Sequence, residues 1–430
     1  MRTNTKPSPT LPAAVTAVAL LSALVAVGAS SAGAQPSQDV AAAARTQSTI
    51  LISRTRGGKV PNGASTNAVM SNDKRYVRAI AFESEASDLG PRDRNGLKDV
   101  YAVLRGNHAN NKGTAWKPGR NILISRTPGG AAGNGESYSP AIGGGFHSAP
   151  KCVAFLSAAS NLVRGDTNSQ PDAFVKKLRS GKVRRVLPSG GQPKAPATAV
   201  AVSGDCKLIA FVQGGKLYVS KGGRKAKRVS TPGTAADPSF STGLTNDLVY
   251  GARGGAYLRK NGTGHARLVG RGGRNPAYND LKNRVVAYEK RRGGHWQIAS
   301  HGIGKVDKRI GKREKIVSDY HGNPGNGDSR DPVVGNSGFY VTFESDAGNL
   351  GTSASGRSND GNDATDVFLY TDVRKLTLIE SVDSPGGGLP AGGNNPSMSY
   401  YANYITFDSP AQLSSGEGNR QIFMRYLGGI

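Results

Sequence analysis

The stretch ILISRT at residues 50–55 occurs a second time, letter for letter, at residues 122–127. Both copies lead into a glycine turn, RGG at 56–58 and PGG at 128–130. The β-branched residues of the run predict a strand. The first copy stands alone near the start of the chain, whereas the second ends a longer repeat. We therefore expect residues 49–55 to complete the last repeat of a closed ring, which leaves no sheet edge open.

Seven apolar strands, each with an anchoring aromatic residue, divide the rest of the chain. Phe211, Tyr250 and Tyr288 lie 39 and 38 residues apart, which is the length of one four-stranded propeller blade. A third strand follows each aromatic strand, and a fourth follows in six repeats. The seventh repeat reaches the C-terminus without a fourth strand. The anchoring residues are Phe82, Phe155, Phe211, Tyr250, Tyr288, Phe343 and Phe407.

A short strand precedes each aromatic strand and carries proline in one slot of five repeats. We expect proline to open this strand, because the first residue of a strand lacks only a peripheral N–H. The fold class that follows is all-β: a single propeller of seven four-stranded blades over residues 49–430, with six blades as the alternative. A sandwich or a β-helix also suits the alternation, but neither explains the displaced strand. The slot holds Pro140, Pro238, Pro276, Pro332 and Pro396, with Ala68 and Ala199 in the other two repeats.

Two of the repeats carry a more specific pattern. FESEASDLGPRDRNGLKDVYAVL (82–104) and FLSAASNLVRGDTNSQPDAFVKKL (155–178) resemble the TolB-like, WD-type propeller repeats of secreted bacterial proteins. The resemblance covers the chain from about residue 49 and is weakest in the third to fifth repeats. It implies a propeller with a binding role, but a fold does not identify a ligand. Six blades are usual in that family, so our count of seven departs from it.

The N-terminus has the pattern of a secretory signal. Arg2 and Lys6 precede an apolar run, and Ala32-Gly33-Ala34 supplies a small-residue cleavage site, so residues 1–34 are predicted to be a cleaved signal peptide. A retained membrane anchor is the alternative. Residues 35–48, rich in Ala, Gln and Ser, are predicted to be a disordered linker. The expected location is extracytoplasmic.

The formal net charge of the chain is +26. A secreted protein this basic should be attracted to polyanions such as acidic envelope polymers, or to anionic lipid head groups at a membrane surface. An extracellular protein is a further possible partner, and we expect a monomer. Nucleic acid is not expected, because secretion removes the protein from it.

Lysine and arginine are concentrated in the turns between third and fourth strands. Such turns lie on one face of a propeller, so the sequence predicts a basic rim that holds a polyanion. The competing interpretation is that these charges only keep exposed hairpins soluble. The predicted polyanion-binding residues are Lys305, Lys308, Arg309, Lys312, Arg313, Lys221, Arg224, Lys225, Lys176 and Lys177.

Cys152 and Cys206 are the two cysteines of the chain, three residues before Phe155 and five before Phe211. These positions lie near the same rim of adjacent blades. In a secreted protein a pair so placed is predicted to form a disulfide. The closed loop of about 50 residues would contribute roughly 4 kcal/mol in the chain-entropy treatment.

The loops between second and third strands repeat the pattern D-x-N-x-x-x-D. Alternate oxygen ligands on a turning backbone are typical of Ca²⁺ sites, so Ca²⁺ is the one cofactor that the sequence suggests. Asx-turns that shape the hairpin are the alternative. The residues are Asp93, Asn95, Asp99, Asp166, Asn168, Asp172, Asp360, Asn362 and Asp366.

Two classes of function remain open from the sequence. We favour a non-catalytic binding propeller and predict no catalytic residues. The alternative is a polysaccharide lyase or hydrolase acting at the mouth of the central channel, which would require several titratable residues to converge there. The histidines do not favour it, because they are scattered without metal-ligand spacing: His108, His147, His265, His295, His301 and His321.

Overall fold

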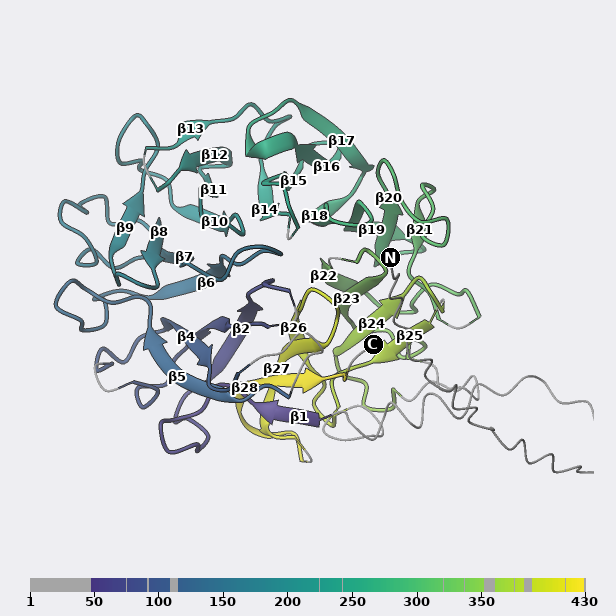
Figure 1. The fold of residues 1–430 in the computed structure, drawn as a ribbon, viewed down its shortest axis with the longest axis horizontal. Helices are drawn as coiled ribbons and strands as arrows, with labels where there is room; N and C mark the ends of the chain where they lie inside the picture. Colours follow the sequence, from purple (N-terminus) through teal and green to yellow (C-terminus); the bar gives the residue numbers. More distant parts are fainter. Residues whose placement is uncertain are drawn as a thin grey trace, which may run out of the picture. The chain divides into compact units, whose positions relative to one another are not determined.

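Seven four-stranded antiparallel sheets follow one another around a ring (Figure 1). The computed structural model describes residues 48–428 apart from residues 75, 91–92, 109–114, 224, 242, 320, 336, 352–359, 375, 383–388 and 414. The predicted signal peptide and residues 35–47 of the predicted linker lie outside the described residues. Ser48 already belongs to a strand, so the propeller begins one residue earlier than predicted.

Each blade is listed here from its inner to its outer strand. Blade 1 contains β2 (Ser65–Met70), β3 (Ala79–Ser84), β4 (Asp99–Arg105) and β5 (Pro118–Leu123), and blade 2 contains β6 (Ser137–Ile142), β7 (Cys152–Ser157), β8 (Asp172–Lys177) and β9 (Val183–Val186). Blade 3 contains β10 (Ala197–Val202), β11 (Leu208–Gln213), β12 (Lys216–Lys221) and β13 (Lys227–Arg228), and blade 4 contains β14 (Ala236–Phe240), β15 (Leu248–Ala252), β16 (Gly255–Arg259) and β17 (Ala266–Arg271). Blade 5 contains β18 (Arg274–Asn279), β19 (Val285–Arg292), β20 (His295–Gly302) and β21 (Lys315–Ile316), and blade 6 contains β22 (Ser329–Val334), β23 (Tyr340–Ser345), β24 (Asp366–Thr371) and β25 (Leu376–Ile379). Blade 7 contains β26 (Asn394–Met398), β27 (Tyr404–Gln412), β28 (Glu417–Tyr426) and, as its outer strand, β1 (Ser48–Leu51).

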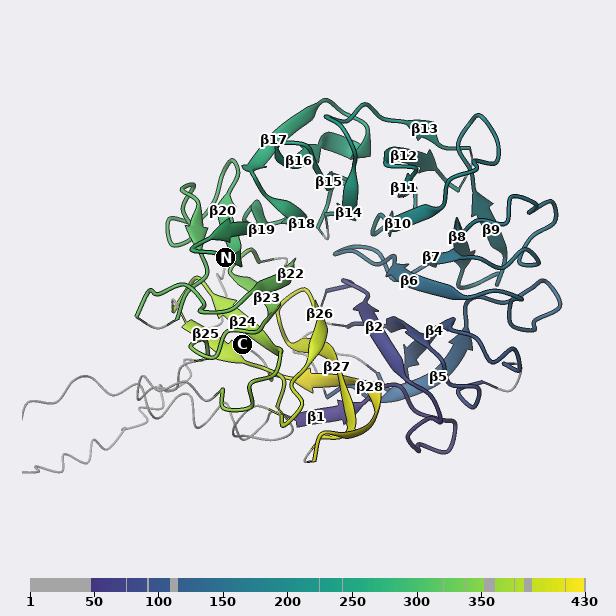
Figure 2. The same cartoon turned by 180° about the vertical axis from the view of Figure 1, so that it is seen from behind.

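The inner strands close the ring. Each inner strand contacts the inner strands of both neighbouring blades, in the cycle β2, β6, β10, β14, β18, β22, β26 and back to β2. Figure 2 shows these strands nearest the centre of the ring. The described strands thus form a seven-bladed propeller, as predicted, and not the six-bladed alternative.

The N-terminal strand closes the last blade. β1 pairs antiparallel with β28, with Leu51 opposite Phe423 (Figure 1). Beyond the strand, the Ile52 N–H donates to the Ile422 carbonyl at 2.8 Å. The predicted role of the first ILISRT copy is therefore confirmed.

The hydrophobic core lies in layers between neighbouring blades. Each of the seven buried apolar clusters combines residues of two adjacent blades, including the pair of blades 7 and 1 that closes the ring. All seven predicted anchoring aromatics are fully buried. In six blades the aromatic pairs with another on the third strand, as Phe155 does with Phe174 at 5.6 Å between ring centroids. Blade 5 departs from this pattern, because Ala299 stands opposite Tyr288.

The prolines do not open the inner strands, contrary to our prediction. Pro140 is the fourth residue of β6, and a register shift between Tyr138 and Ala141 marks a bulge there. Ser139, just before it, has a left-handed backbone with φ of 50°. All seven inner strands carry such a shift. Proline is tolerated because a bulge leaves a residue outside the hydrogen-bond ladder.

Helical structure is minimal in the described part of the chain. It consists of one 3₁₀ turn, η1 (Lys260–Gly262), in the turn between β16 and β17. Within the described residues, no helix has the length and apolar character needed to cross a membrane.

Candidate functional site

The propeller has two faces with different loops. In blade 1, Ser84 at the end of β3 pairs with Asp99 at the start of β4, and Arg105 at the end of β4 pairs with Pro118 of β5. Turns between second and third strands and turns between third and fourth strands therefore lie on opposite faces. We call the first face the link face, since the connections between blades also lie there, and the second the basic face.

Most of the predicted polyanion-binding residues lie exposed on the basic face. Arg309 is held in place, because its Nη2 lies 3.0 Å from Asp307 Oδ2 and its guanidinium lies 4.7 Å from the ring centroid of Phe339. Arg224 lies outside the described residues. The exposed residues of the predicted set are Lys177, Lys221, Lys225, Lys305, Lys308, Arg309, Lys312 and Arg313.

Lys176 is not part of that surface, and including it in the basic rim was wrong. Its side chain is 1% exposed, and its Nζ donates to the carbonyls of Leu123 and Ile124 in blade 1, the latter at 3.2 Å. Strand alternation explains the error: Lys176 shares the face of β8 that carries Phe174, which packs against blade 1. Burial, followed by the charge of Arg126, lowers the pKa of Lys176 to about 7.

A cleft of about 690 Å³ opens between blades 2 and 3 on the basic face. Its buried lining is apolar and consists of Val175, Ile209 and Cys152. The other lining includes the cationic residues Lys151, Lys177, Arg179, Lys182 and Arg184, of which Arg184 is half-buried and the others are exposed. Two of these five, Lys151 and Arg184, lie outside the turns in which the sequence predicted the basic rim.

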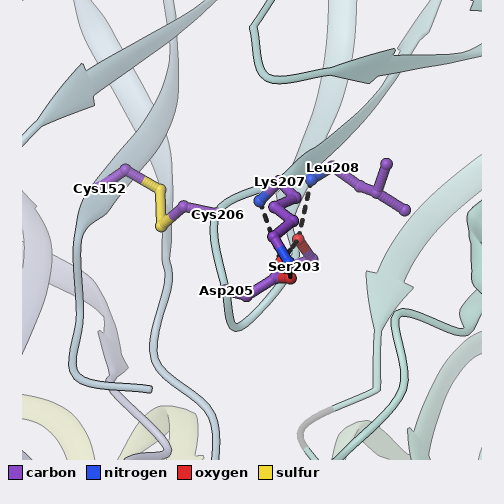
Figure 3. Close-up of a disulfide and its surroundings, with 6 residues drawn as sticks. All are labelled: Cys152, Ser203, Asp205, Cys206, Lys207 and Leu208. Carbon is purple, nitrogen blue, oxygen red and sulfur yellow. Dashed lines mark hydrogen bonds and ion pairs between the residues drawn. A yellow bond between two sulfur atoms is a disulfide. The ribbon is translucent and has the colours of Figure 1, made fainter.

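The predicted disulfide joins Cys152 to Cys206 with the Cα atoms 6.2 Å apart (Figure 3). Cys206 lies in the turn between β10 and β11, with φ of 61°. Ser203 organises this turn by donating to Asp205 Oδ1 at 2.8 Å and accepting the Leu208 N–H at 2.9 Å. The bond links blade 2 to blade 3 at one end of the cleft.

The Asp–Asn loops on the link face make contacts within the protein. In the first loop, Asn95 Nδ2 donates to Asp99 Oδ2 at 2.8 Å and to the Gly133 carbonyl at 2.9 Å, while its Oδ1 accepts the Leu97 N–H. Asn168 and Asn362 repeat this arrangement with Asp172 and Asp366. These are the contacts of the Asx-turn alternative.

No group of three or more His, Cys, Asp or Glu residues in the described part of the chain is placed to hold a metal ion. Asp93, the first residue of its loop, accepts the Tyr101 hydroxyl at 2.5 Å. Asp166 instead pairs with Arg185 Nη1 at 2.5 Å. Asp360, the third such residue, is half-buried, and burial raises its pKa. The Ca²⁺ interpretation therefore remains a prediction.

The third-strand aspartates of two of these loops are buried acids. Asp99 and Asp366 are fully buried, and each accepts a serine hydroxyl, from Ser125 and Ser381. Burial raises the pKa of each to about 7, against the lowering effect of the serine hydrogen bond. These residues shape the link face through their contacts within the protein.

Polar residues that the sequence analysis missed ring the mouth of the central channel. The residue before each bulge proline, or its equivalent, lines a cavity of about 430 Å³. Six of the seven have a left-handed backbone, with φ between 45° and 53°, which Asn and Asp tolerate better than other side chains. The signal was present as a polar residue before every proline. The seven residues are Asn67, Ser139, Thr198, Asp237, Asn275, Asp331 and Asn395.

Carboxylates from the second strands join this ring. Glu83 Oε2 accepts the Ser139 N–H of the next blade at 2.9 Å, and Glu344 Oε2 accepts the Asn395 N–H at 2.7 Å. Glu289 and Asp408 accept the corresponding N–H groups of blades 6 and 1. These hydrogen bonds clasp neighbouring blades together.

Several acids at this mouth are hard to ionise. Burial raises the pKa of Asp331 and of Asp237, and the charge of Glu289 raises each further. Burial also raises the pKa of Glu344, to about 7. Glu289 has a cationic partner, since Arg274 Nε lies 2.7 Å from its Oε2.

Comparison with known proteins adds little to this geometry. No protein-family model matches the chain, and no curated protein matches it. Among solved structures, a chain from Agrobacterium tumefaciens described as a TolB protein is similar at 16% identity, over 58% of this chain and 96% of that chain, with a TM-score of 0.36. The seven-bladed fold rests on the strand pairing of this chain itself.

Proposed function

We propose that this protein is a non-catalytic binding propeller whose basic face holds an anionic envelope polymer outside the cell. The observation that carries the proposal is the set of exposed lysine and arginine residues in the third-to-fourth turns of blades 2, 3 and 5. Within the described residues, Lys305, Lys308, Lys312 and Arg313 have no ion-pair partner. Exposed like charges on one face attract a polyanion through many weak contacts.

Three features of the chain support this proposal. The net charge of +26 favours association with polyanions. The signal-like N-terminus would deliver the protein to the extracytoplasmic space, where such polymers lie. In the loops of the link face, by contrast, aspartates accept hydrogen bonds from within the protein. This contrast favours the basic face as the binding surface.

The test is retention of the mature protein on an immobilised anionic polymer, with heparin as the probe, at increasing salt. We expect retention to fall by orders of magnitude between low and moderate salt, because each neutralised polymer charge releases a counterion, as for DNA. Replacing Lys305, Lys308, Lys312 and Arg313 together by Gln should elute the protein at lower salt. The matched control likewise removes three lysines and one arginine at exposed positions in other parts of the chain: Lys59, Lys194, Lys216 and Arg253.

The basic face would be only a solvated surface if both variants eluted with the wild type. Equal melting temperatures would show that neither set of substitutions disturbs the ring, since exposed side chains contribute little to stability.

The carboxylates at the channel mouth favour a second candidate function, a lyase or hydrolase. Asp237 and Asp331 line the same cavity there, and raised pKa values such as theirs are common in catalytic acids. Hydrolysis of a panel of acidic and neutral polysaccharides, measured as reducing ends, would test it. Activity that disappears in the Asp237→Asn and Asp331→Asn variants would favour this candidate over the binding propeller.

A further inference from the structure

We propose that the cleft between blades 2 and 3 binds a single-chain amphiphilic anion, an acyl or alkyl chain that carries a carboxylate or phosphate head group. The inference rests on the proposed function, because the cleft belongs to the same basic face. It adds a discrete site with a defined chemistry to a surface that would otherwise hold polymers by charge alone.

The positive charges that line the cleft favour an anionic ligand. Five cationic side chains line one cavity, and none of the five has an ion-pair partner within the described part of the chain. The cleft has a single acidic lining residue, Asp205, which lies 3.3 Å from Lys207 Nζ and accepts the Asn246 amide at 3.3 Å. Cations held together in a cleft repel one another and focus a positive potential into it, so a bound anion is favoured.

The apolar inner surface of the cleft favours a ligand with a hydrocarbon chain attached to its anionic head group. Val175 and Ile209 are 7% and 1% exposed and line the cleft together with the two disulfide cysteines. Neither polymer sugars nor inorganic anions would use this surface, whereas a hydrocarbon chain gains free energy by leaving water. The combination of a cationic entrance and an apolar interior fits an amphiphile.

The size and rigidity of the cleft fit one small molecule. Its volume of about 690 Å³ lies within the range of roughly 300–1,000 Å³ that is usual for small-molecule sites. It can hold one chain and is too small for a bilayer leaflet, so we infer a monomeric ligand. The Cys152–Cys206 bond ties the two walls together, and a preorganised site loses less entropy on binding.

The direct test is calorimetric titration of the mature protein with dodecyl phosphate, kept below its micelle concentration. We expect one site per chain. Inorganic phosphate tests the head group alone and dodecyl maltoside tests the chain alone, and both should bind at least about tenfold more weakly. Equal binding of either control probe would overturn the proposal, because the cleft would then recognise only charge or only apolar surface.

Variants locate the site. Replacing Lys182 and Arg184 by Gln should weaken dodecyl phosphate about tenfold or more, the factor expected when charge-assisted hydrogen bonds are lost. Ser180→Trp, at an exposed lining position, should block binding without changing the charge. The matched control, Lys312→Gln with Arg313→Gln in blade 5, should leave dodecyl phosphate binding within about twofold of the wild type.

The two proposals fail separately. The variant that replaces Lys305, Lys308, Lys312 and Arg313 supports both proposals if it loses heparin retention and binds dodecyl phosphate normally. Normal heparin retention together with absent dodecyl phosphate binding would overturn the amphiphile site alone. Binding of dodecyl phosphate that survives both cleft variants would place it elsewhere and overturn the site as well.

Discussion

Lys176 is a lysine on the face of β8 that packs into the hydrophobic core. The alternation of β8 sends its side chain between blades 1 and 2, where its ammonium group reaches the carbonyls of Leu123, the last residue of β5, and of Ile124 just beyond it. β5 is the outer strand of blade 1, so no further strand of that blade pairs with its far side. The Ile124 carbonyl also accepts the Arg126 N–H at 2.9 Å. Lys176 thus supplies hydrogen bonds to an edge, at the cost of burying an amine.

That cost predicts a pH dependence. The pKa of Lys176 is about 7 in the folded protein, against about 10.4 for an unfolded lysine. Between these values the unfolded chain holds a proton that the folded chain lacks, so the contribution of Lys176 to stability rises with pH from about 7 to 10. Lys176→Met should lose this rise in melting temperature. The control Lys177→Met, at the exposed neighbouring position, should keep it.

Gly143 shows a second requirement at the residue scale. A Cβ added there would overlap Cys206 Sγ and lie 3.3 Å from Cys152 Sγ. We expect Gly143→Ala to destabilise the oxidised protein by about 1–3 kcal/mol, the usual cost of overpacking. Urea unfolding of this variant in a Cys152→Ala/Cys206→Ala background should show a smaller loss, since the obstructing sulfurs are gone. Equal losses in both backgrounds would mean that the disulfide does not require the glycine.

At the scale of the element, the two ILISRT copies make the same contacts. Ser125 Oγ accepts the Val100 N–H at 2.9 Å, and Ser53 Oγ accepts the Ile422 N–H at 2.8 Å. Each serine also donates a hydrogen bond to a side chain on the third strand of its blade. The acceptor is Asp99 of β4 in blade 1 and Gln421 of β28 in blade 7. Identical letters therefore mark identical structural positions: β5 and β1 are both the outer strands of their blades, although β1 precedes the rest of blade 7 in sequence.

These matched serines allow the closure of the ring to be measured. Ser53→Ala and Ser125→Ala each leave a buried N–H and a buried acceptor unpaired, which costs about 1–3 kcal/mol. We expect similar losses of unfolding free energy in urea at pH 8, with the larger at Ser125 because its acceptor, Asp99, is a carboxylate at that pH. A loss at Ser125 with none at Ser53 would show that the N-terminal strand does not hold the ring closed.

Strands, their order and the shared last blade could be predicted from the sequence, because they depend on local periodicity and one exact repeat. The disulfide also followed from register, since both cysteines precede known strands. Lys176 could not be placed, because the face of a strand that meets the next blade depends on blade packing. The position of Pro140 was predicted wrongly for a similar reason. A proline fits both the first residue of a strand and a bulge within it, because neither position needs an N–H in the hydrogen-bond ladder.

The functional surfaces were harder to predict than the strands. The basic rim followed from turn positions, since turns of one kind share a face. The cleft did not, because Val175 of blade 2 and Ile209 of blade 3 line one cavity only when the two blades pack. The polar ring at the channel mouth combines one residue from each of seven repeats. A polar residue before each proline was visible in the sequence, but the left-handed backbone that six of the seven share was not.

The whole molecule separates its charges and its core. Apolar layers lie between blades, so each blade is stabilised by two neighbours and the ring has no free end. The basic face carries exposed cations, while several carboxylates of the link face and channel mouth are buried or accept hydrogen bonds from the neighbouring blade. A protein built this way can present its positive face to an anionic polymer while its acids serve the structure.

Those acids should make the ring less stable as pH rises. The pKa values of Asp99, Glu344 and Asp366 are about 7 in the folded protein, against about 3.9 for Asp and 4.3 for Glu when unfolded. From about pH 4 to 7 the folded chain therefore binds protons that the unfolded chain has released, and the stability these protons supply is lost as pH rises through 7.

Asp366→Asn isolates this effect from the overall charge of the chain. The variant keeps the shape of the side chain but cannot ionise, so the fall in melting temperature between pH 5 and 8 should be smaller than in the wild type. Asp363→Asn removes the same charge at an exposed position of the same loop and should leave the slope unchanged. The falling net positive charge opposes the effect equally in both variants. A slope that changes as much in the control would assign the pH dependence to net charge and not to the buried carboxyl.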